Sequence, residues 1–141
     1  MNTKPKTVIL DSSVWIAYFR TQDAHHLRAL AVIDKFQDHL FLIPEIVYYE
    51  TIIRYFTLYP SITSVKSLIF SLKSSAKVKF CNLNIVELEY LILKYLMLIQ
   101  LKSSDFQILI YVIKFTPNAF ITFDKRLRRE YNKLANKNEL L

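Results

Sequence analysis

Glycine is absent from this chain of 141 residues. A Walker phosphate loop, a dinucleotide-binding turn and a nucleophile elbow each need glycine where the backbone turns sharply or lies against a phosphate. The sequence therefore excludes proteins whose function depends on any of these three loops.

Cysteine and histidine are scarce, at one and three residues. Cys81 has no second cysteine for an intrachain disulfide, and the three histidines, two of them adjacent at 25 and 26, give no structural zinc pattern. Any bound metal is therefore expected to have carboxylate ligands. No basic stretch precedes a long apolar one and a small-residue cleavage site at the N-terminus, so we expect a cytoplasmic location.

Long uncharged apolar runs are also missing. The most apolar segment, residues 83–101, contains Glu87, Glu89 and Lys94, and charged side chains are costly in the middle of a bilayer. We expect a buried helix in this segment and no association with a membrane.

What the chain does have is apolar residues and positive charge. Hydrophobic residues make up 52% and charged residues 22%, which predicts one globular domain over residues 1–141. The 19 Lys and Arg residues against 12 Asp and Glu give a net charge of +7. Such an excess attracts a polyanion, either nucleic acid or an acidic membrane face, without choosing between them.

Short apolar runs alternate with longer segments of helical periodicity. The runs predict strands at 7–11, 39–43, 77–81 and 119–123. Helices are predicted at 14–19, 23–36, 45–58, 62–72, 84–100, 103–115 and from 125 onward, with N-caps at Ser12-Ser13, Asn84 and Ser103-Ser104. This alternation favours an α/β sandwich around a mainly parallel sheet of four to five strands.

Asp11 and Asp124 hold equivalent positions, each directly after an apolar strand. Ligand sites in open α/β sheets lie at the carboxyl ends of the strands. Each aspartate also suits a simpler role as the N-cap of the helix that follows.

Asp105 and Glu50 each interrupt an apolar helical stripe. Asp105 shares its stripe with Ile108 and Leu109, so its carboxylate is expected to face inward. Glu50 lies in the same way between apolar positions, although Arg54 one turn later offers an ion pair instead.

The four acids can converge on one site, because two strand ends and two inward helix faces can meet at one edge of the sheet. Clustered carboxylates repel one another unless they are protonated or neutralised by cations. Carboxylate oxygens favour Mg²⁺ or Mn²⁺, and such ions promote phosphodiester hydrolysis. We therefore predict that Asp11, Glu50, Asp105 and Asp124 form a catalytic, metal-binding site.

The chain resembles a PIN domain, and more narrowly the VapC-type ribonuclease toxins. The resemblance spans nearly the whole chain. It rests on four pieces in order, VILDSSVWI at 8–16, Pro44 leading to Glu50, Ser103-Ser104-Asp105, and ITFDKRL at 121–127.

The resemblance implies a PIN-like α/β/α sandwich and a metal-dependent endoribonuclease in which the four acids hold Mg²⁺ or Mn²⁺ directly or through water. Ser13 and Thr122 match positions that orient a carboxylate or a metal-bound water. Many members have a glycine before the fourth strand, where Asn118 is expected to adopt the left-handed conformation here.

Four basic residues follow Asp124 and are candidates for guiding an RNA backbone, namely Lys125, Arg126, Arg128 and Arg129. By resemblance, an antitoxin protein is the expected regulatory partner and a homodimer the expected assembly. Two alternatives remain: a non-toxin PIN nuclease acting in RNA processing or on DNA, and a catalytically silent α/β domain that binds nucleic acid or protein.

Overall fold

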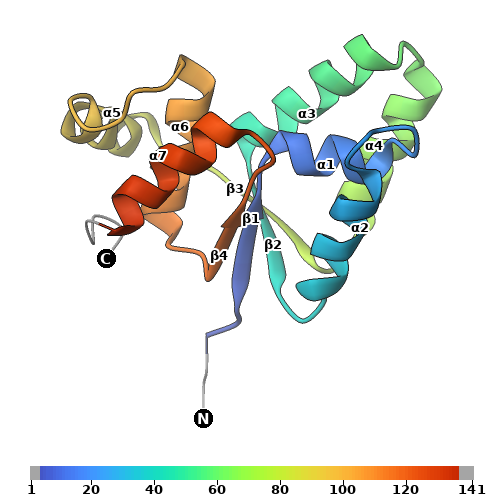
Figure 1. Ribbon diagram of the computed structural model, residues 1–141, viewed down its shortest axis with the longest axis horizontal. Helices are drawn as coiled ribbons and strands as arrows, with labels where there is room; N and C mark the ends of the chain where they lie inside the picture. Colours follow the sequence, from blue (N-terminus) through green and yellow to red (C-terminus); the bar gives the residue numbers. More distant parts are fainter. Residues whose placement is uncertain (1–3, 137–141) are drawn as a thin grey trace.

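The computed structural model describes residues 4–136, which form a central sheet between two groups of helices (Figure 1). The strands are β1 (Thr7–Leu10), β2 (Leu40–Pro44), β3 (Val78–Cys81) and β4 (Ala119–Ile121). They pair in the order β3-β2-β1-β4 and every pair is parallel. The predicted parallel sheet is confirmed, with four strands in the described part of the chain.

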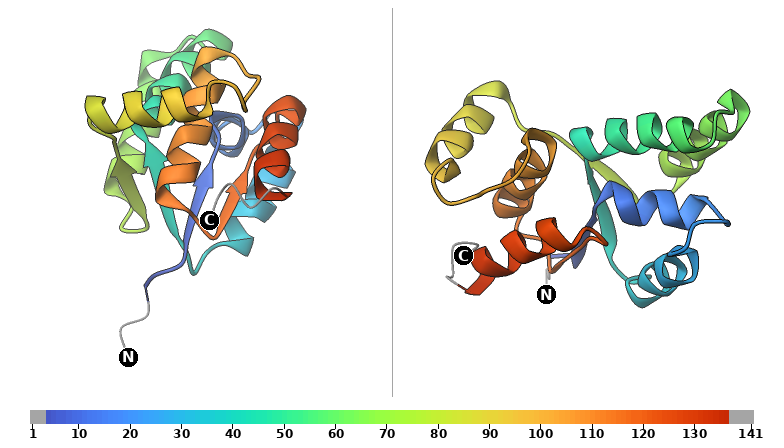
Figure 2. Two further views of the ribbon diagram at one scale, coloured as in Figure 1. Left: turned by 90° about the vertical axis from the view of Figure 1, so that its left-hand side faces the viewer. Right: turned by 45° about the horizontal axis from the view of Figure 1, so that its top comes forward.

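Helices cover both faces of this sheet. They are α1 (Ser12–Phe19), α2 (His26–Lys35), α3 (Glu45–Leu58), α4 (Ile62–Ser74), α5 (Ile85–Tyr95), α6 (Ser103–Phe115) and α7 (Lys125–Asn136). Figures 1 and 2 show α1, α2 and α4 on one side and α5, α6 and α7 on the other. The α/β/α sandwich predicted from the sequence is confirmed.

The central strand β1 is buried on both faces. Val8, Ile9 and Leu10 are fully buried, as an apolar run in a covered parallel strand requires. Asp11 extends the pairing beyond the strand, since its backbone N–H donates to the Ile121 carbonyl at 2.9 Å. The residues that follow β1 and β4 therefore lie together at the carboxyl edge of the sheet.

The buried helix predicted over residues 83–101 is wrong in both length and burial. Helix α5 ends at Tyr95, the one residue of the helix that is buried. Val86 is 72% exposed, Leu93 71%, and Met97, just beyond the helix, 91%. Helix α5 packs against α6 at the outside of the molecule, so much of its apolar surface has no partner within the described chain.

None of the helices among residues 4–136 has the length and apolar content of a membrane span.

Two of the predicted N-caps are also wrong. Ser12 and Ser13 lie inside α1, and Ser103 and Ser104 lie inside α6, whose N-cap is Lys102. The hydroxyls of Ser12 and Ser13 bond instead to carboxylates, as described below. The Asn84 cap is confirmed, since its side chain accepts from the backbone N–H of Glu87 at 2.9 Å.

Among residues 4–136 the left-handed residue is Thr116, with φ of 41°, and not Asn118 as predicted. Thr116 terminates α6, and its N–H donates to the Val112 carbonyl at 2.9 Å. Asn118 has another role: its Oδ1 accepts from the backbone N–H of Thr7, and its own N–H donates to the Thr7 carbonyl, both at 2.9 Å. The left-handed residue of the turn between α6 and β4 therefore lies at the end of the helix rather than directly before the strand.

Candidate functional site

Asp11 is the most deeply buried of the four predicted acids, at 3% exposure. Its Oδ2 accepts hydrogen bonds from Thr122 Oγ1 at 2.8 Å and from Ser13 Oγ at 2.9 Å. Its Oδ1 is buried and has no hydrogen-bond partner. Burial raises the pKa of Asp11, and the hydrogen bonds from Thr122 and Ser13 act in the opposite direction. One oxygen is thus fixed by hydroxyls and the other is left for a further partner.

The same two hydroxyls hold the loop that carries Asp124. Ser13 Oγ accepts from the backbone N–H of Phe123 at 3.1 Å, and Thr122 Oγ1 accepts from that of Asp124 at 3.0 Å. Ser13 and Thr122 therefore connect the Asp11 carboxylate to the segment between β4 and α7.

Asp124 caps α7, as the simpler interpretation of the sequence allowed. Its Oδ1 accepts from the backbone N–H groups of Arg126 at 2.9 Å and Leu127 at 3.0 Å. The residue is exposed to solvent. A cap is compatible with a ligand role because the second carboxylate oxygen is not needed for it.

Glu50 projects from α3 toward the start of α1. Its Oε1 accepts from the Ser12 hydroxyl and lies 3.3 Å from Arg54 Nη1. The Glu50 side chain is 17% exposed, and the Arg54 side chain 54%. The ion pair that the sequence left open is present, next to the site rather than in place of it.

Asp105, in the first turn of α6, has a pKa that its surroundings raise well above the ordinary value. Its pKa is raised to about 6, first by burial and then by the negative charges of Asp11, Asp124 and Glu50, while Arg54 lowers it. Asp105 therefore lies close enough to the other three predicted acids for their charges to act on it.

Asp11, Asp105 and Asp124 line one pocket of about 280 Å³, together with Ser13 and Arg54. Several of these residues follow the carboxyl ends of β1 and β4, where α1 and α7 begin, and Figure 1 shows these ends side by side at the top of the sheet. Glu50 is not part of the lining, but its ion-pair partner Arg54 is.

The carboxylate oxygens of this pocket are donors of the kind that a divalent cation prefers, but they are not grouped into a complete ligand set. Within residues 4–136, no three Asp, Glu, His or Cys side chains are grouped closely enough to hold a metal. Glu50 is engaged by Ser12 and Arg54, and one oxygen of Asp124 caps α7. The unpartnered Oδ1 of Asp11 and the Asp105 carboxyl, whose pKa is raised by burial and by the neighbouring carboxylates, are the groups that a bound cation would stabilise.

The pocket also contains residues that the sequence did not indicate. Asp23, His25 and Phe123 also line it, and the apolar Ile16 and Leu58 make up the rest of the lining. Asp23 and His25 come from the segment between α1 and α2, which has no motif or periodicity that connects it to residue 123. Of the first three of these residues, only Phe123 could have been suspected from the sequence, because it directly precedes the predicted ligand Asp124.

Residues 8–133 match the family model of the PIN domain. The chain belongs to the PIN domain family. This confirms the resemblance drawn from the four sequence pieces and agrees with the α/β/α sandwich around a parallel sheet. A comparison with curated proteins finds no match.

Among solved structures, this PIN domain is similar to VapC20 of Mycobacterium tuberculosis, a toxin that cleaves the sarcin–ricin loop. The TM-score is 0.70 at 14% sequence identity, over 86% of this chain and 93% of VapC20. The shared structure is thus the fold of a VapC toxin, as the sequence resemblance indicated.

Proposed function

We propose that this PIN domain is a metal-dependent endoribonuclease of the VapC type, the toxin of a toxin–antitoxin pair. The observation that carries the proposal is the pocket in which Asp11 leaves a buried oxygen without a partner beside Asp105, whose pKa is raised to about 6. A hydrolase that uses a metal ion to cleave phosphodiester bonds needs neighbouring carboxylates, which explains why these acids lie close together despite their repulsion.

Asp11, Glu50, Asp105 and Asp124 would hold Mg²⁺ or Mn²⁺, directly or through water. A bound divalent ion supplies an activated water and neutralises charge on the phosphoryl oxygens. Ser13 and Thr122 orient Asp11 for this task because both donate to its Oδ2, which leaves Oδ1 directed elsewhere. Glu50, paired with Arg54, is the acid best placed to act through water.

An RNA strand would approach along α7. The start of this helix presents four exposed basic side chains directly after Asp124, namely Lys125, Arg126, Arg128 and Arg129. Positive side chains beside an acidic pocket attract the phosphate backbone toward it, and this contact weakens as salt is added.

Partners are proposed from the same family relationship. An antitoxin would regulate the nuclease, in the cytoplasm. A homodimer is supported by the uncovered apolar side chains of residues 85–97, since exposed apolar patches of this kind mark interaction surfaces. The exposed members are Ile85, Val86, Tyr90, Leu93, Leu96 and Met97.

The proposal predicts that the purified protein cleaves single-stranded or structured RNA with Mn²⁺ or Mg²⁺ and stops when EDTA is added. The reason is that the clustered acids cannot act on an anionic substrate until a cation neutralises them. Cleavage is followed on labelled RNA, with matched DNA in parallel. RNA binding without cleavage and without Mn²⁺ binding by calorimetry would identify a silent binding domain, and cleavage of DNA alone would identify a different nuclease.

Replacing Thr122 by Val tests the support of Asp11. The change keeps the side-chain shape and removes the hydroxyl that donates to Oδ2 at 2.8 Å. Loss of such a supporting group is expected to lower Mn²⁺ affinity or cleavage about 10- to 100-fold. Thr51→Val is the matched control, because Thr51 is also buried but donates to the Val47 carbonyl inside α3. Equal losses in both variants would show a general packing defect.

A further inference from the structure

The pocket extends past the carboxylates onto a surface of aromatic and basic side chains. This surface, the His25 platform, consists of His25, Arg28 and Phe123. Two of these residues, His25 and Phe123, line the same pocket as Asp11, Asp105 and Asp124. The metal chemistry proposed above uses no part of the platform, so its role is still to be explained.

Both exposed members of the platform, His25 and Arg28, pack on the Phe123 ring. Arg28 Cζ lies over the Phe123 ring, 4.6 Å from the centroid. The His25 ring packs against the same phenylalanine, with centroids 5.2 Å apart and planes tilted by 40°. Phe123 is partly buried by these neighbours, whereas His25 is exposed. Of the two aromatic rings, the imidazole is therefore the one more accessible to a ligand.

The segment that carries His25 is held by its own hydrogen bonds. Asp23 Oδ1 accepts from the backbone N–H of His25 at 2.8 Å, and the Asp23 carbonyl accepts from that of His26 at 3.0 Å. The His26 ring nitrogen Nδ1 lies 2.7 Å from the Ala17 carbonyl oxygen and fastens the start of α2 to α1. The His25 ring is thus presented by a fixed turn, which lowers the entropy cost of binding a ligand against it.

We propose that His25, backed by Phe123 and Arg28, stacks against one unpaired nucleobase of the RNA whose backbone lies at the carboxylates. This inference rests on the proposed function and adds a substrate contact to it. Aromatic and guanidinium planes are the surfaces on which proteins stack single-stranded bases. A base inside a duplex offers no free face, so the platform selects RNA that is unpaired at this position.

The test uses single-stranded oligoribonucleotides of about ten nucleotides, each with one 2-aminopurine at a different position. The fluorescence of this base falls when it stacks. Binding is measured with Ca²⁺ in place of Mn²⁺, and affinity by the anisotropy of a terminal dye. The full-length wild type is expected to quench 2-aminopurine at one position more than at the others.

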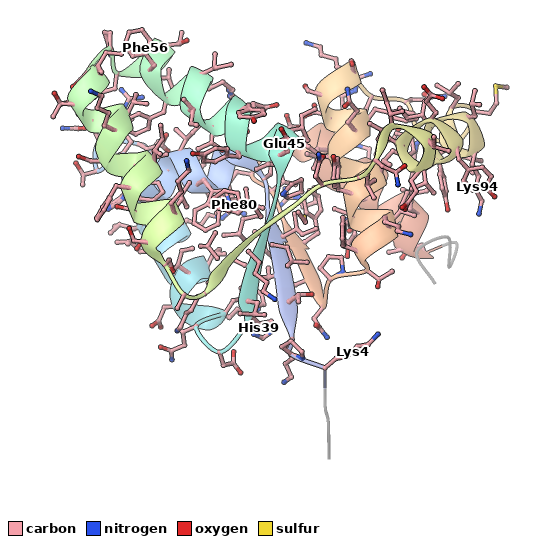
Figure 3. All side chains as sticks on the ribbon, turned by 180° about the vertical axis from the view of Figure 1, so that it is seen from behind. Lys4, His39, Glu45, Phe56, Phe80 and Lys94 are labelled. Atoms are coloured by element: carbon pink, nitrogen blue, oxygen red, sulfur yellow. The ribbon has the colours of Figure 1, made fainter. Side chains whose placement is uncertain are left out.

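Three variants separate stacking from structure. His25→Ala is expected to remove the position-specific quenching and to weaken binding roughly 5- to 100-fold, the usual effect of losing one base stack. His25→Phe keeps a ring and should retain both. His39→Ala is the matched control, because His39 also packs on a phenylalanine, Phe36, with centroids 5.0 Å apart, at the opposite end of the sheet (Figure 3). It should leave the quenching unchanged.

Two results would contradict the proposed stacking on His25. One is equal quenching at every position in the wild type, and the other is unchanged quenching and affinity in His25→Ala. Either result leaves Mn²⁺-dependent cleavage intact as a separate observation. Conversely, position-specific quenching without any RNA cleavage would keep the platform and reject the nuclease.

Discussion

Replacing Asp11 by Asn is expected to lower Mn²⁺-dependent RNA cleavage by at least about 100-fold, while the protein stays folded. The asparagine side chain has nearly the shape of the aspartate and fits a position that is 3% exposed. Its amide oxygen still accepts from Thr122 and Ser13. What it removes is the negative charge beside the unpartnered Oδ1, which is the feature most directly connected to a bound cation.

The measurement is the rate of RNA cleavage at saturating Mn²⁺, with the Mn²⁺ affinity determined by calorimetry and folding checked by circular dichroism. Asp38→Asn is the control, because Asp38 is an exposed aspartate whose partner is His39, away from the pocket. Cleavage at the wild-type rate by a folded Asp11→Asn protein would remove Asp11 from the catalytic site and, with it, the main support for the proposed function.

Replacing Asp105 by Asn is expected to move activity and stability in opposite directions. Cleavage should fall at least about 100-fold, because Asp105 is one of the proposed metal ligands. The metal-free protein should become more stable, because the change removes a charge that burial and the neighbouring carboxylates make unfavourable.

The sign of the stability change follows from the pKa. Asp105 has a pKa of about 6 in the folded protein against an ordinary value of 3.8. The folded state therefore holds the proton more tightly, and the stability due to this group is complete below pH 4 and is lost as the pH rises to about 6. After allowance for partial solvent exposure, the cost of the ionised group above this range is about 1–2 kcal/mol.

Thermal unfolding in EDTA at pH 8 is thus expected to show a Tm about 3–8 °C higher for Asp105→Asn than for the wild type. At pH 4 the difference should nearly vanish, since the aspartate is then protonated in the folded state. Added Mn²⁺ should stabilise the wild type more than the variant. Asp38→Asn should give no such increase, because the hydrogen bond from His39 lowers the pKa of Asp38. An Asp105→Asn protein that is less stable than the wild type in EDTA at pH 8 would contradict the repulsion argued here.

Much of the fold was predictable because it depends on local patterns. The β-branched run before Asp11 predicts a strand covered on both faces, and Val8, Ile9 and Leu10 are fully buried. Helix α3 has the predicted bounds, Glu45–Leu58, because Pro44 precedes its start and Pro60 follows its end. The buried helix was wrong for a different reason. Apolar composition suggested a buried helix at 83–101, but burial needs a neighbouring surface, and α5 meets one only on the side toward α6.

The sequence by itself determined the acids, their order along the chain and their relation to strand ends and helix faces. The scarcity of cysteine and histidine also led to the prediction that any metal ligands are carboxylates. These conclusions follow from residue type and short-range periodicity, which need no knowledge of distant contacts.

Only the tertiary structure decided which oxygen of each acid is engaged and what else shares the pocket. Ser13 and Thr122 meet at one oxygen of Asp11 because β4 pairs beside β1, although residues 11 and 122 are far apart in the chain. His25, in the segment that connects α1 to α2, likewise contacts Phe123 only because the folded chain brings these distant residues together. Hydrogen bonds and ring contacts depend on positions in space to within a fraction of an ångström, and these positions are set by packing of the whole chain.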